Sequence, residues 1–284
     1  MNRFDYFRPQ TLEEAFKLKR RHPGAAYIAG GTDIMVRIKN REIRPPVLVS
    51  LKNIPELASI EINGGARLGA LVTMRAVIQS PELTRMYPVL VAAARRLGSV
   101  QIRNAATLGG NLCNGSPCAD TATALLVLEA KLKLQTPEET REVPVRDFFK
   151  GPGELVLKAG EILTEIILNP PNGGAKAIFL KNGRVKMDLA KASVAILLEL
   201  HGKRCTNVRI AAGSVAPVPL RLDEVENLIR GNVLSHELLA EAQKLAAQTV
   251  SPISDIRSTE EYRRRITGVY VRQGLEILMA RSRT

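Results

Sequence analysis

Two glycine-rich stretches dominate the sequence. Residues 29–34 read AGGTDI and directly follow a short apolar run, and residues 107–111 read TLGGN. Paired glycines let the backbone approach a ligand closely because no Cβ is in the way. Successive N–H groups in such turns form an anion-binding concavity, and threonine, asparagine and serine side chains add neutral donors. One such loop alone is typical of a tight turn, but two that both lead into helices favour a cradle for the pyrophosphate of a dinucleotide.

Two aspartates follow these loops, Asp33 and Asp120. A carboxylate does not help to bind a bare phosphate. We therefore expect these side chains either to accept hydrogen bonds from ribose or ribityl hydroxyls, or to cap the helices that follow them. The sequence contains no P-loop, no G-x-G-x-x-G fingerprint, no H-E-x-x-H and no G-x-S-x-G motif. We expect no self-contained acid–base site and assign no catalytic residue to this chain.

Cysteine is scarce and does not form a ligand motif. Cys113 and Cys118 have the C-x4-C spacing that opens a plant-type iron–sulfur motif, but the next ligand position is occupied by Thr121. Cys205 stands alone, and the three histidines are widely separated. We interpret the cysteines as packing or loop residues and predict no metal on this chain.

Length and composition are those of an ordinary globular chain. It has 284 residues, of which 45% are hydrophobic, and this suits two modest domains with real cores. No apolar run approaches the roughly 18 residues that a spanning helix needs, so we expect no membrane span. The residues after Met1 form no apolar signal segment, and an odd number of cysteines argues against a disulfide framework. The expected compartment is therefore the cytoplasm.

Positive charge is the one unusual quantity. Lys and Arg number 41 against 28 Asp and Glu, which gives a net charge of +13. The basic residues are spread along the chain, and the densest clusters, 17–21 and 263–265, fall in expected helices. They suit solvated helix faces, with an acidic partner protein or anionic ligand as the alternative. Aromatic residues make up only 4%, few for a stacking surface, so we expect no nucleic-acid partner.

Local signals in the first half predict mixed helices and strands. Thr11 opens a capping box for a helix that stops at residues 23–24, and residues 59–71 read as a hairpin. The stretch 99–120 has low periodicity and is rich in glycine, asparagine and serine. Asp120 then begins an apolar helix.

The second half reads as a small sheet followed by helices. Strands are expected at 193–200 and 208–212, after a proline- and glycine-rich boundary at 170–174. Helices are expected over 237–250 and from a capping box at Ser258 onward. The whole order of elements predicts an α+β protein.

The segments 29–34 and 107–120 together resemble the FAD-binding subunit of the molybdenum hydroxylases, which are the medium subunits of xanthine dehydrogenase and carbon monoxide dehydrogenase. Residues 213–221 and 262–265 resemble its C-terminal domain. The resemblance covers essentially the whole chain. It implies an FAD-binding fold of the vanillyl-alcohol oxidase (PCMH) type in two subdomains over residues 1–174. It also implies a C-terminal α+β domain over residues 175–284, with a small antiparallel sheet and helices.

The resemblance also implies roles for individual residues. The first loop and part of the second would contact the FAD pyrophosphate, and Ser116 and Asp120 would lie along its ribityl and adenosine side. Ile162 or Leu163 would pack against the flavin. Lys181 resembles a lysine that reaches the isoalloxazine, but the segment 181–190 is one residue shorter than usual, and a solvated loop lysine is the alternative. The implied cofactor-binding residues are Ala29, Gly30, Gly31, Thr32, Asp33, Ile34, Thr107, Gly109, Gly110, Asn111, Asn114, Ser116, Asp120, Ile162, Leu163 and Lys181.

The activity that the resemblance implies is electron transfer. In this family a molybdenum cofactor on a large molybdopterin-binding subunit oxidises the substrate, and electrons pass through [2Fe–2S] clusters on a small subunit to FAD. The acceptor would be NAD+ or another electron acceptor, and the assembly a heterotrimer or its dimer. Asn111 and residues 114–117 look nearer the xanthine dehydrogenase type. The alternatives are a self-contained FAD-dependent reductase of the same fold and, more distantly, a basic nucleic-acid-binding module.

Overall fold

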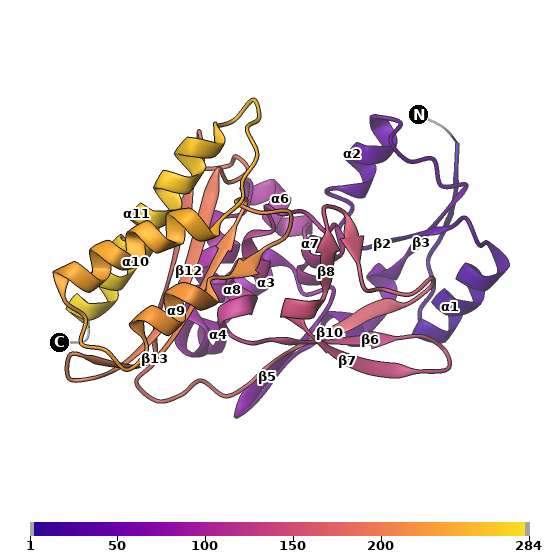
Figure 1. The fold of residues 1–284 in the computed structure, drawn as a ribbon. Helices are drawn as coiled ribbons and strands as arrows, with labels where there is room; N and C mark the ends of the chain where they lie inside the picture. Colours follow the sequence, from indigo (N-terminus) through magenta and orange to yellow (C-terminus); the bar gives the residue numbers. More distant parts are fainter. Residues whose placement is uncertain (1–2, 282–284) are drawn as a thin grey trace.

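The computed structural model describes residues 3–281, so Met1 and Asn2 of the N-terminal stretch lie outside the described residues. Figure 1 shows three parts in a row: an N-terminal lobe at one end, a middle lobe, and a C-terminal domain whose yellow and orange helices form the other end. The N-terminal lobe is a parallel sheet in the order β1-β3-β2 with flanking helices. Its elements are β1 (Asp5–Phe7), α1 (Leu12–Arg21), β2 (Ala26–Ile28), α2 (Ile34–Lys39), β3 (Val47–Ser50) and the short 3-10 turns η1 (Leu51–Asn53) and η2 (Pro55–Ala58).

Helix α1 forms where its capping box predicts it. Thr11 adopts an extended conformation and its Oγ1 accepts a hydrogen bond from the backbone N–H of Glu14 at 3.2 Å. Ala15 and Phe16 are buried and pack with Val49 of β3 in one apolar cluster. This packing fixes the sheet from which the first glycine-rich loop leaves.

The middle lobe combines an antiparallel sheet, in the order β4-β5-β10-β6-β7, with six helices. The predicted hairpin is confirmed as β4 and β5. The strands are β4 (Ile60–Asn63), β5 (Gly65–Gly69), β6 (Lys131–Gln135), β7 (Thr140–Pro144), the small pair β8 (Phe149–Gly151) and β9 (Glu154–Leu155), and β10 (Ile162–Leu168). The helices are α3 (Met74–Gln79), α4 (Pro81–Met86), α5 (Pro88–Arg96), α6 (Val100–Ala105), α7 (Leu108–Cys113), α8 (Asp120–Val127) and the 3-10 turn η3 (Val145–Asp147).

The C-terminal domain is a four-stranded antiparallel sheet covered by helices, as the sequence predicts. The strands are β11 (Lys176–Asn182), β12 (Ala192–His201), β13 (Arg204–Gly213) and β14 (Leu220–Arg221), in that order across the sheet. The helices are α9 (Asp223–Ile229), α10 (His236–Thr249) and α11 (Glu260–Arg281).

Within residues 3–281, no helix combines the length and apolar character that a bilayer span requires.

The sheet of the C-terminal domain is buried on both faces. Val194 and Ile196 of β12 share an apolar cluster with Val271 of α11. Their neighbours Ala195 and Leu197 point the other way and belong to the core of the middle lobe. Because alternate residues of one strand enter two cores, the strand reads as a continuous apolar run rather than an alternating one.

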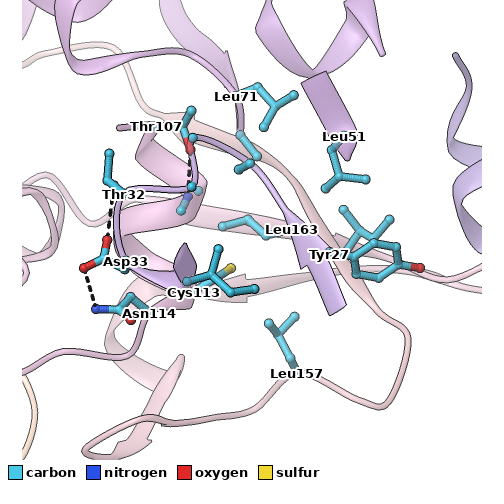
Figure 2. Close-up of a pocket in the computed structure, with 18 of the residues that line it drawn as sticks. Tyr27, Thr32, Asp33, Leu51, Leu71, Thr107, Cys113, Asn114, Leu157 and Leu163 are labelled. Carbon is cyan, nitrogen blue, oxygen red and sulfur yellow. Dashed lines mark hydrogen bonds between the residues drawn. The ribbon is translucent and has the colours of Figure 1, made fainter. Parts of the chain in front are cut away.

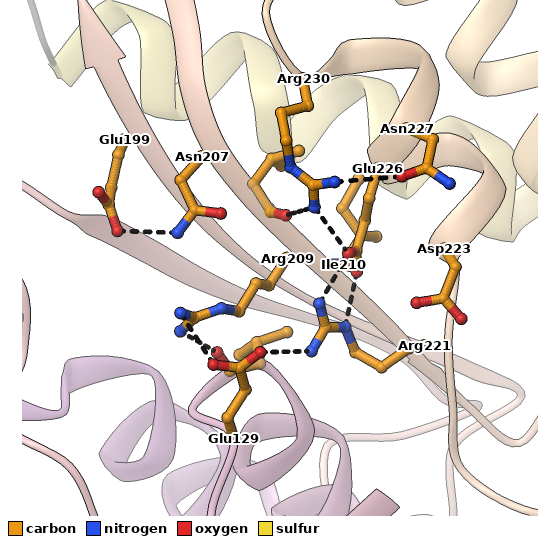
Figure 3. A network of polar contacts seen from close by, with 12 residues as sticks. Glu129, Glu199, Asn207, Arg209, Ile210, Arg221, Asp223, Glu226, Asn227 and Arg230 are labelled. Carbon is orange, nitrogen blue, oxygen red and sulfur yellow. Dashed lines mark hydrogen bonds and ion pairs between the residues drawn. The ribbon is translucent and has the colours of Figure 1, made fainter.

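Ion pairs and hydrogen bonds stabilise the contact between the middle lobe and the C-terminal domain at one edge of the sheet (Figure 3). Glu129, just after α8, pairs with Arg209 of β13 at 2.9 Å and lies 3.6 Å from Arg221. Arg221 also forms two 2.6 Å hydrogen bonds to the buried carboxylate of Glu226, which accepts a further bond from the N–H of Ile210 at 2.8 Å. The network joins the end of α8 to the C-terminal sheet.

Two local features differ from what the sequence signals. The low-periodicity stretch 99–120 contains α6 and α7, each only six residues long and too short to show a helical period. The cap of α11 is not Ser258 but Thr259, whose Oγ1 accepts from the N–H of Tyr262 at 3.3 Å. Ser258 instead belongs to the preceding turn, where its N–H donates to Asp255.

Candidate cofactor site

A pocket of about 230 Å3 lies between the N-terminal and middle lobes (Figure 2). Polar residues of the two glycine-rich loops form one side, and apolar side chains from both lobes form the other. Figure 2 shows Thr32, Asp33 and Asn114 facing it from one side and Leu51 and Tyr27 from the other. The lining comprises Tyr27, Ala29, Gly30, Gly31, Thr32, Asp33, Ile34, Arg37, Leu51, Ala70, Leu71, Thr107, Gly109, Gly110, Cys113, Asn114, Leu157, Glu161, Ile162 and Leu163.

Close packing explains why these loops carry glycine. A Cβ on Gly30 would lie 2.0 Å from the carbonyl oxygen of Ala105, and a Cβ on Gly109 would lie 2.6 Å from Cβ of Ala70. A Cβ on Gly110 would lie 3.8 Å from Cβ of Ala29, so the two loops are neighbours. The absence of side chains lets the lobes close on each other around the pocket.

The first loop has free backbone donors. Among the residues that the structure describes, none accepts a hydrogen bond from the backbone N–H groups of residues 30–33. Gly31 has φ +80°, the left-handed conformation that glycine adopts readily and that such concave turns require. These N–H groups are therefore available to a ligand in the pocket.

The second loop has no such free donors. The N–H groups of residues 108–111 donate to the carbonyls of Val72 and Ala70 and to Oγ1 and the carbonyl of Thr107, at 2.8–3.0 Å. Thr107 is thereby the N-cap of α7. This loop contributes the shape of the pocket and polar side chains, and its backbone is held by the middle lobe.

Asp33 lines the pocket and does not cap the helix that it precedes. It occupies the N-cap position of α2 without a capping hydrogen bond, so the capping alternative is wrong here. Its Oδ1 accepts from Asn114 and its Oδ2 from Thr32, both at 3.3 Å (Figure 2). Burial raises the pKa of Asp33, and the Thr32 hydroxyl and the Arg37 guanidinium oppose this shift. The Asn114 bond links the first loop to the end of α7.

Four of the sequence-predicted residues lie outside the lining of this pocket: Asn111, Ser116, Asp120 and Lys181. The side chain of Asn111 accepts a 2.5 Å hydrogen bond from the Thr121 hydroxyl, and Ser116 Oγ accepts from the N–H of Cys118 at 3.1 Å. Both side chains thus stabilise the segment that connects α7 to α8.

Asp120 and Lys181 form a buried ion pair between the middle lobe and the C-terminal domain. Lys181 Nζ lies 2.6 Å from Asp120 Oδ2, and the two side chains are 3% and 4% exposed. Nζ also donates to the carbonyl of Arg96 at 3.0 Å. The alternative of a solvated loop lysine is therefore wrong, because Lys181 lies within β11 and is buried. Burial raises the pKa of Asp120 to about 6 even though the Lys181 ammonium opposes the shift.

Sequence reasoning missed several residues of the pocket. Cys113 faces it from the end of α7. Glu161 and Leu157 precede β10 in an irregular segment that carries no motif, and only a fold-level argument could have found them. Residues 3–281 hold no group of three or more His, Cys, Asp or Glu side chains placed to bind a metal ion.

The pocket combines glycine-rich loops, free N–H donors and an apolar wall. These features are typical of a protein that binds a dinucleotide cofactor. Residues 2–171 match the FAD binding domain in molybdopterin dehydrogenase, and residues 177–278 match the CO dehydrogenase flavoprotein C-terminal domain. The chain therefore belongs to the FAD-binding subunits of the molybdenum hydroxylases, which are multisubunit oxidoreductases. The resemblance seen in the sequence is confirmed, and with it the FAD cofactor.

Individual relatives agree with this assignment. The xanthine dehydrogenase FAD-binding subunit of Escherichia coli is 33% identical over 262 residues, which cover 91% of this chain and 90% of the relative. The carbon monoxide dehydrogenase medium chain of Afipia carboxidovorans is 32% identical over 282 residues, 99% of this chain and 98% of the relative. A structure of reconstituted CO dehydrogenase from Oligotropha carboxidovorans superposes with a TM-score of 0.95 at 32% identity, covering 99% of each chain.

Proposed function

We propose that this chain binds FAD in the pocket between the N-terminal and middle lobes, in a fold of the vanillyl-alcohol oxidase (PCMH) type. The observation that supports this most directly is the row of free N–H groups at residues 30–33 beside an apolar wall. A hydrogen bond to a charged oxygen contributes about 1.5–3 kcal/mol, so three or four such donors suit a pyrophosphate. The wall, which includes Leu157, Ile162 and Leu163, suits a flat aromatic ring.

We propose different tasks for the predicted residues. The first loop would hold the pyrophosphate, and Asp33 would accept from cofactor hydroxyls. Thr107, Gly109 and Gly110 would shape the site from the opposite loop. Contacts of Asn111, Ser116, Asp120 and Lys181 with the cofactor remain proposals, and each of these side chains has a partner within the chain. We also propose that the two domains comprise residues 1–174 and 175–284, as the family resemblance implies.

Bound FAD would supply the redox chemistry, since a flavin takes up electrons singly and releases them as a pair. The chain's own residues would bind and orient the ring and exclude water from it. We propose that electrons arrive from the clusters of a small [2Fe–2S] subunit, fed by a large molybdopterin-binding subunit, and leave to NAD+ or another acceptor. The net charge of +13 suits docking of acidic partner faces in a heterotrimer or its dimer.

The xanthine dehydrogenase type is the proposed subtype. Residues 114–117 support it, whereas overall identity does not discriminate, because relatives named for xanthine and for carbon monoxide dehydrogenase are 33% and 32% identical. Substrate oxidation by the purified complex, assayed with xanthine and with carbon monoxide, distinguishes the two.

The test of cofactor binding is a titration of the purified chain with FAD, followed by flavin fluorescence and by the absorption spectrum after desalting. Cys113→Phe fills the pocket from an exposed position and is expected to abolish binding. Val185→Phe, at a position 63% exposed outside the pocket, is the matched control and should bind like the wild type. Equal binding by both variants would place FAD elsewhere.

A further inference from the structure

One wall of the pocket is an irregular segment, residues 156–161, between β9 and β10. It carries Leu157 and Glu161 and leads directly into Ile162 and Leu163, all four of which line the pocket. Figure 2 shows Leu157 and Leu163 facing the cavity from this side. A segment without a hydrogen-bonded ladder is mobile unless side chains hold it, so its anchors decide the shape of the wall.

The anchor is a partly buried ion pair to β7, between Arg141 and the buried carboxylate of Glu161. Arg141 donates from Nε and Nη2 to the two carboxylate oxygens of Glu161, at 2.7 and 2.8 Å. The same Nη2 donates to the carbonyl of Val156 at 2.9 Å, and Glu161 Oε2 accepts from the N–H of Lys158 at 2.9 Å. One arginine thus fixes both ends of the segment. Tyr27 of the N-terminal lobe adds a 3.3 Å bond to the carbonyl of Gly160.

The pair also controls the charge of the wall. The Glu161 side chain is 2% exposed although it lines the pocket. Burial alone would raise the pKa of Glu161, but the hydrogen bonds from Arg141 and from the Lys158 N–H lower it below its ordinary value. Glu161 is therefore ionised at neutral pH, and Arg141 neutralises a carboxylate that would otherwise stand bare beside the site.

We propose that Arg141 and Glu161 are a positioning pair for the cofactor. They hold the apolar wall in place and balance the charge beside the flavin ring, so that they set both the affinity for FAD and its reduction potential. The inference rests on the proposed function, because it requires FAD in this pocket. Neither residue belongs to a glycine-rich loop, and neither was predicted from the sequence.

The experiment removes opposite charges from the same pair. Glu161→Gln and Arg141→Gln both release the segment, so each should weaken FAD binding about tenfold, which corresponds to about 1.4 kcal/mol. Glu161→Gln leaves a net positive charge that favours the electron-rich reduced flavin, so the midpoint potential should rise. Arg141→Gln leaves a bare carboxylate, and the potential should fall. Arg141→Lys keeps the positive charge but cannot form the bidentate hydrogen bonds to the carboxylate. The affinity for FAD should therefore fall, while the midpoint potential stays near that of the wild type.

A matched control pair lies in the same five-stranded sheet. Arg67 of β5 pairs with Glu165 of β10 through two hydrogen bonds, of 3.0 and 2.5 Å, away from the pocket lining. Arg67→Gln and Glu165→Gln should leave affinity and potential unchanged. The proposal is wrong if the two charge-removing variants of Arg141 and Glu161 shift the potential in the same direction, or if the control pair behaves like them.

Hydrogen exchange of the cofactor-free chain separates this inference from the proposed function. Amides of residues 156–161 should exchange faster in Glu161→Gln and Arg141→Gln, and at the wild-type rate in both control variants. If the wild-type chain fails to bind FAD, the proposed function is wrong. Hydrogen exchange of residues 156–161 still tests whether Arg141 and Glu161 anchor the wall. Unchanged exchange in all four variants overturns the anchoring itself.

Discussion

The two glycine-rich loops look alike in sequence and differ in what their backbones do. The backbone N–H groups of residues 30–33 donate no hydrogen bond to any described residue, whereas the N–H groups of residues 108–111 all donate within the chain. Both loops line the same pocket. The comparison teaches that a pair of glycines serves two purposes: it presents free donors to a ligand in the first loop, and it allows close packing in the second.

The difference extends beyond the second loop along the chain. From Asn111 to Asp120, every sequence-predicted side chain has a partner within the protein, including the Asn114 bond to Asp33 and the Asp120 pair with Lys181. The segment 107–120 therefore joins the pocket to the C-terminal domain, whereas the first loop presents its donors to the cofactor. Substitutions in the two regions should separate stability from cofactor binding.

The largest expected effect is at Lys181. Lys181→Met leaves the Asp120 carboxylate buried without its partner, and we expect a loss of about 3–5 kcal/mol in the free energy of unfolding. Urea denaturation measures it. The double variant Lys181→Met with Asp120→Asn removes both charges and should regain most of the loss. Equal destabilisation in the single and double variants would show that the lysine acts through packing alone.

The second effect is at Gly109 in the second loop. A methyl group there meets Cβ of Ala70 at 2.6 Å and its carbonyl oxygen at 2.8 Å. Overpacking of this kind costs about 1–3 kcal/mol, so Gly109→Ala should lower the free energy of unfolding by that amount. The control is Gly173→Ala, because a Cβ at Gly173 meets no atom within 4 Å. Loss of FAD affinity with unchanged stability would contradict the structural role of this loop.

The third effect is a pH dependence of the free energy of unfolding, and it arises at Asp120, the last residue of the segment 107–120. The pKa of Asp120 is raised to about 6 in the folded chain by burial, against its ordinary value of 3.8. Between pH 7 and pH 5 the folded state therefore takes up a proton that the unfolded chain does not. Stability from this group rises as the pH falls, by about 1 kcal/mol.

The measurement compares the wild type with Asp120→Asn at the two pH values. Titration of other groups is common to both proteins, so the difference between the two pH dependences isolates Asp120. The variant should lack the increment of about 1 kcal/mol at pH 5. An identical pH dependence in both proteins would show that the carboxyl stays ionised throughout, held by Lys181.

Local sequence signals explain most of the fold. Thr11 caps its helix as predicted, and Ser235 caps α10 in the same way, because a side-chain acceptor one residue before a helix is a local signal. The predicted strands around residues 193–200 and 208–212 form as β12 and β13. The short helices α6 and α7 were missed because six residues cannot display a period, and packing of the middle lobe stabilises them.

The site was predicted where spacing along the chain is the signal, and missed where the fold brings distant segments together. Residues 29–34 line the pocket as a contiguous stretch. In contrast, Arg141 and Glu161 lie 20 residues apart and meet only because β7 and the segment before β10 are neighbours. The pairing of Lys181 with Asp120 spans 61 residues and two domains, and no spacing rule could have predicted it.

The smallest effect on stability is expected at Thr32 in the first loop. Its hydroxyl forms a single 3.3 Å hydrogen bond, to the Asp33 carboxylate, so Thr32→Val should change the free energy of unfolding by less than about 0.5 kcal/mol. Because the residue lies among the free donors of the pocket, FAD affinity should fall several-fold, as a titration followed by fluorescence would show. The partner variant Thr107→Val, which removes the cap of α7, should show the reverse, a loss of about 1 kcal/mol in stability with a smaller change in affinity. If the two threonines behave alike, the division of labour between the loops is wrong.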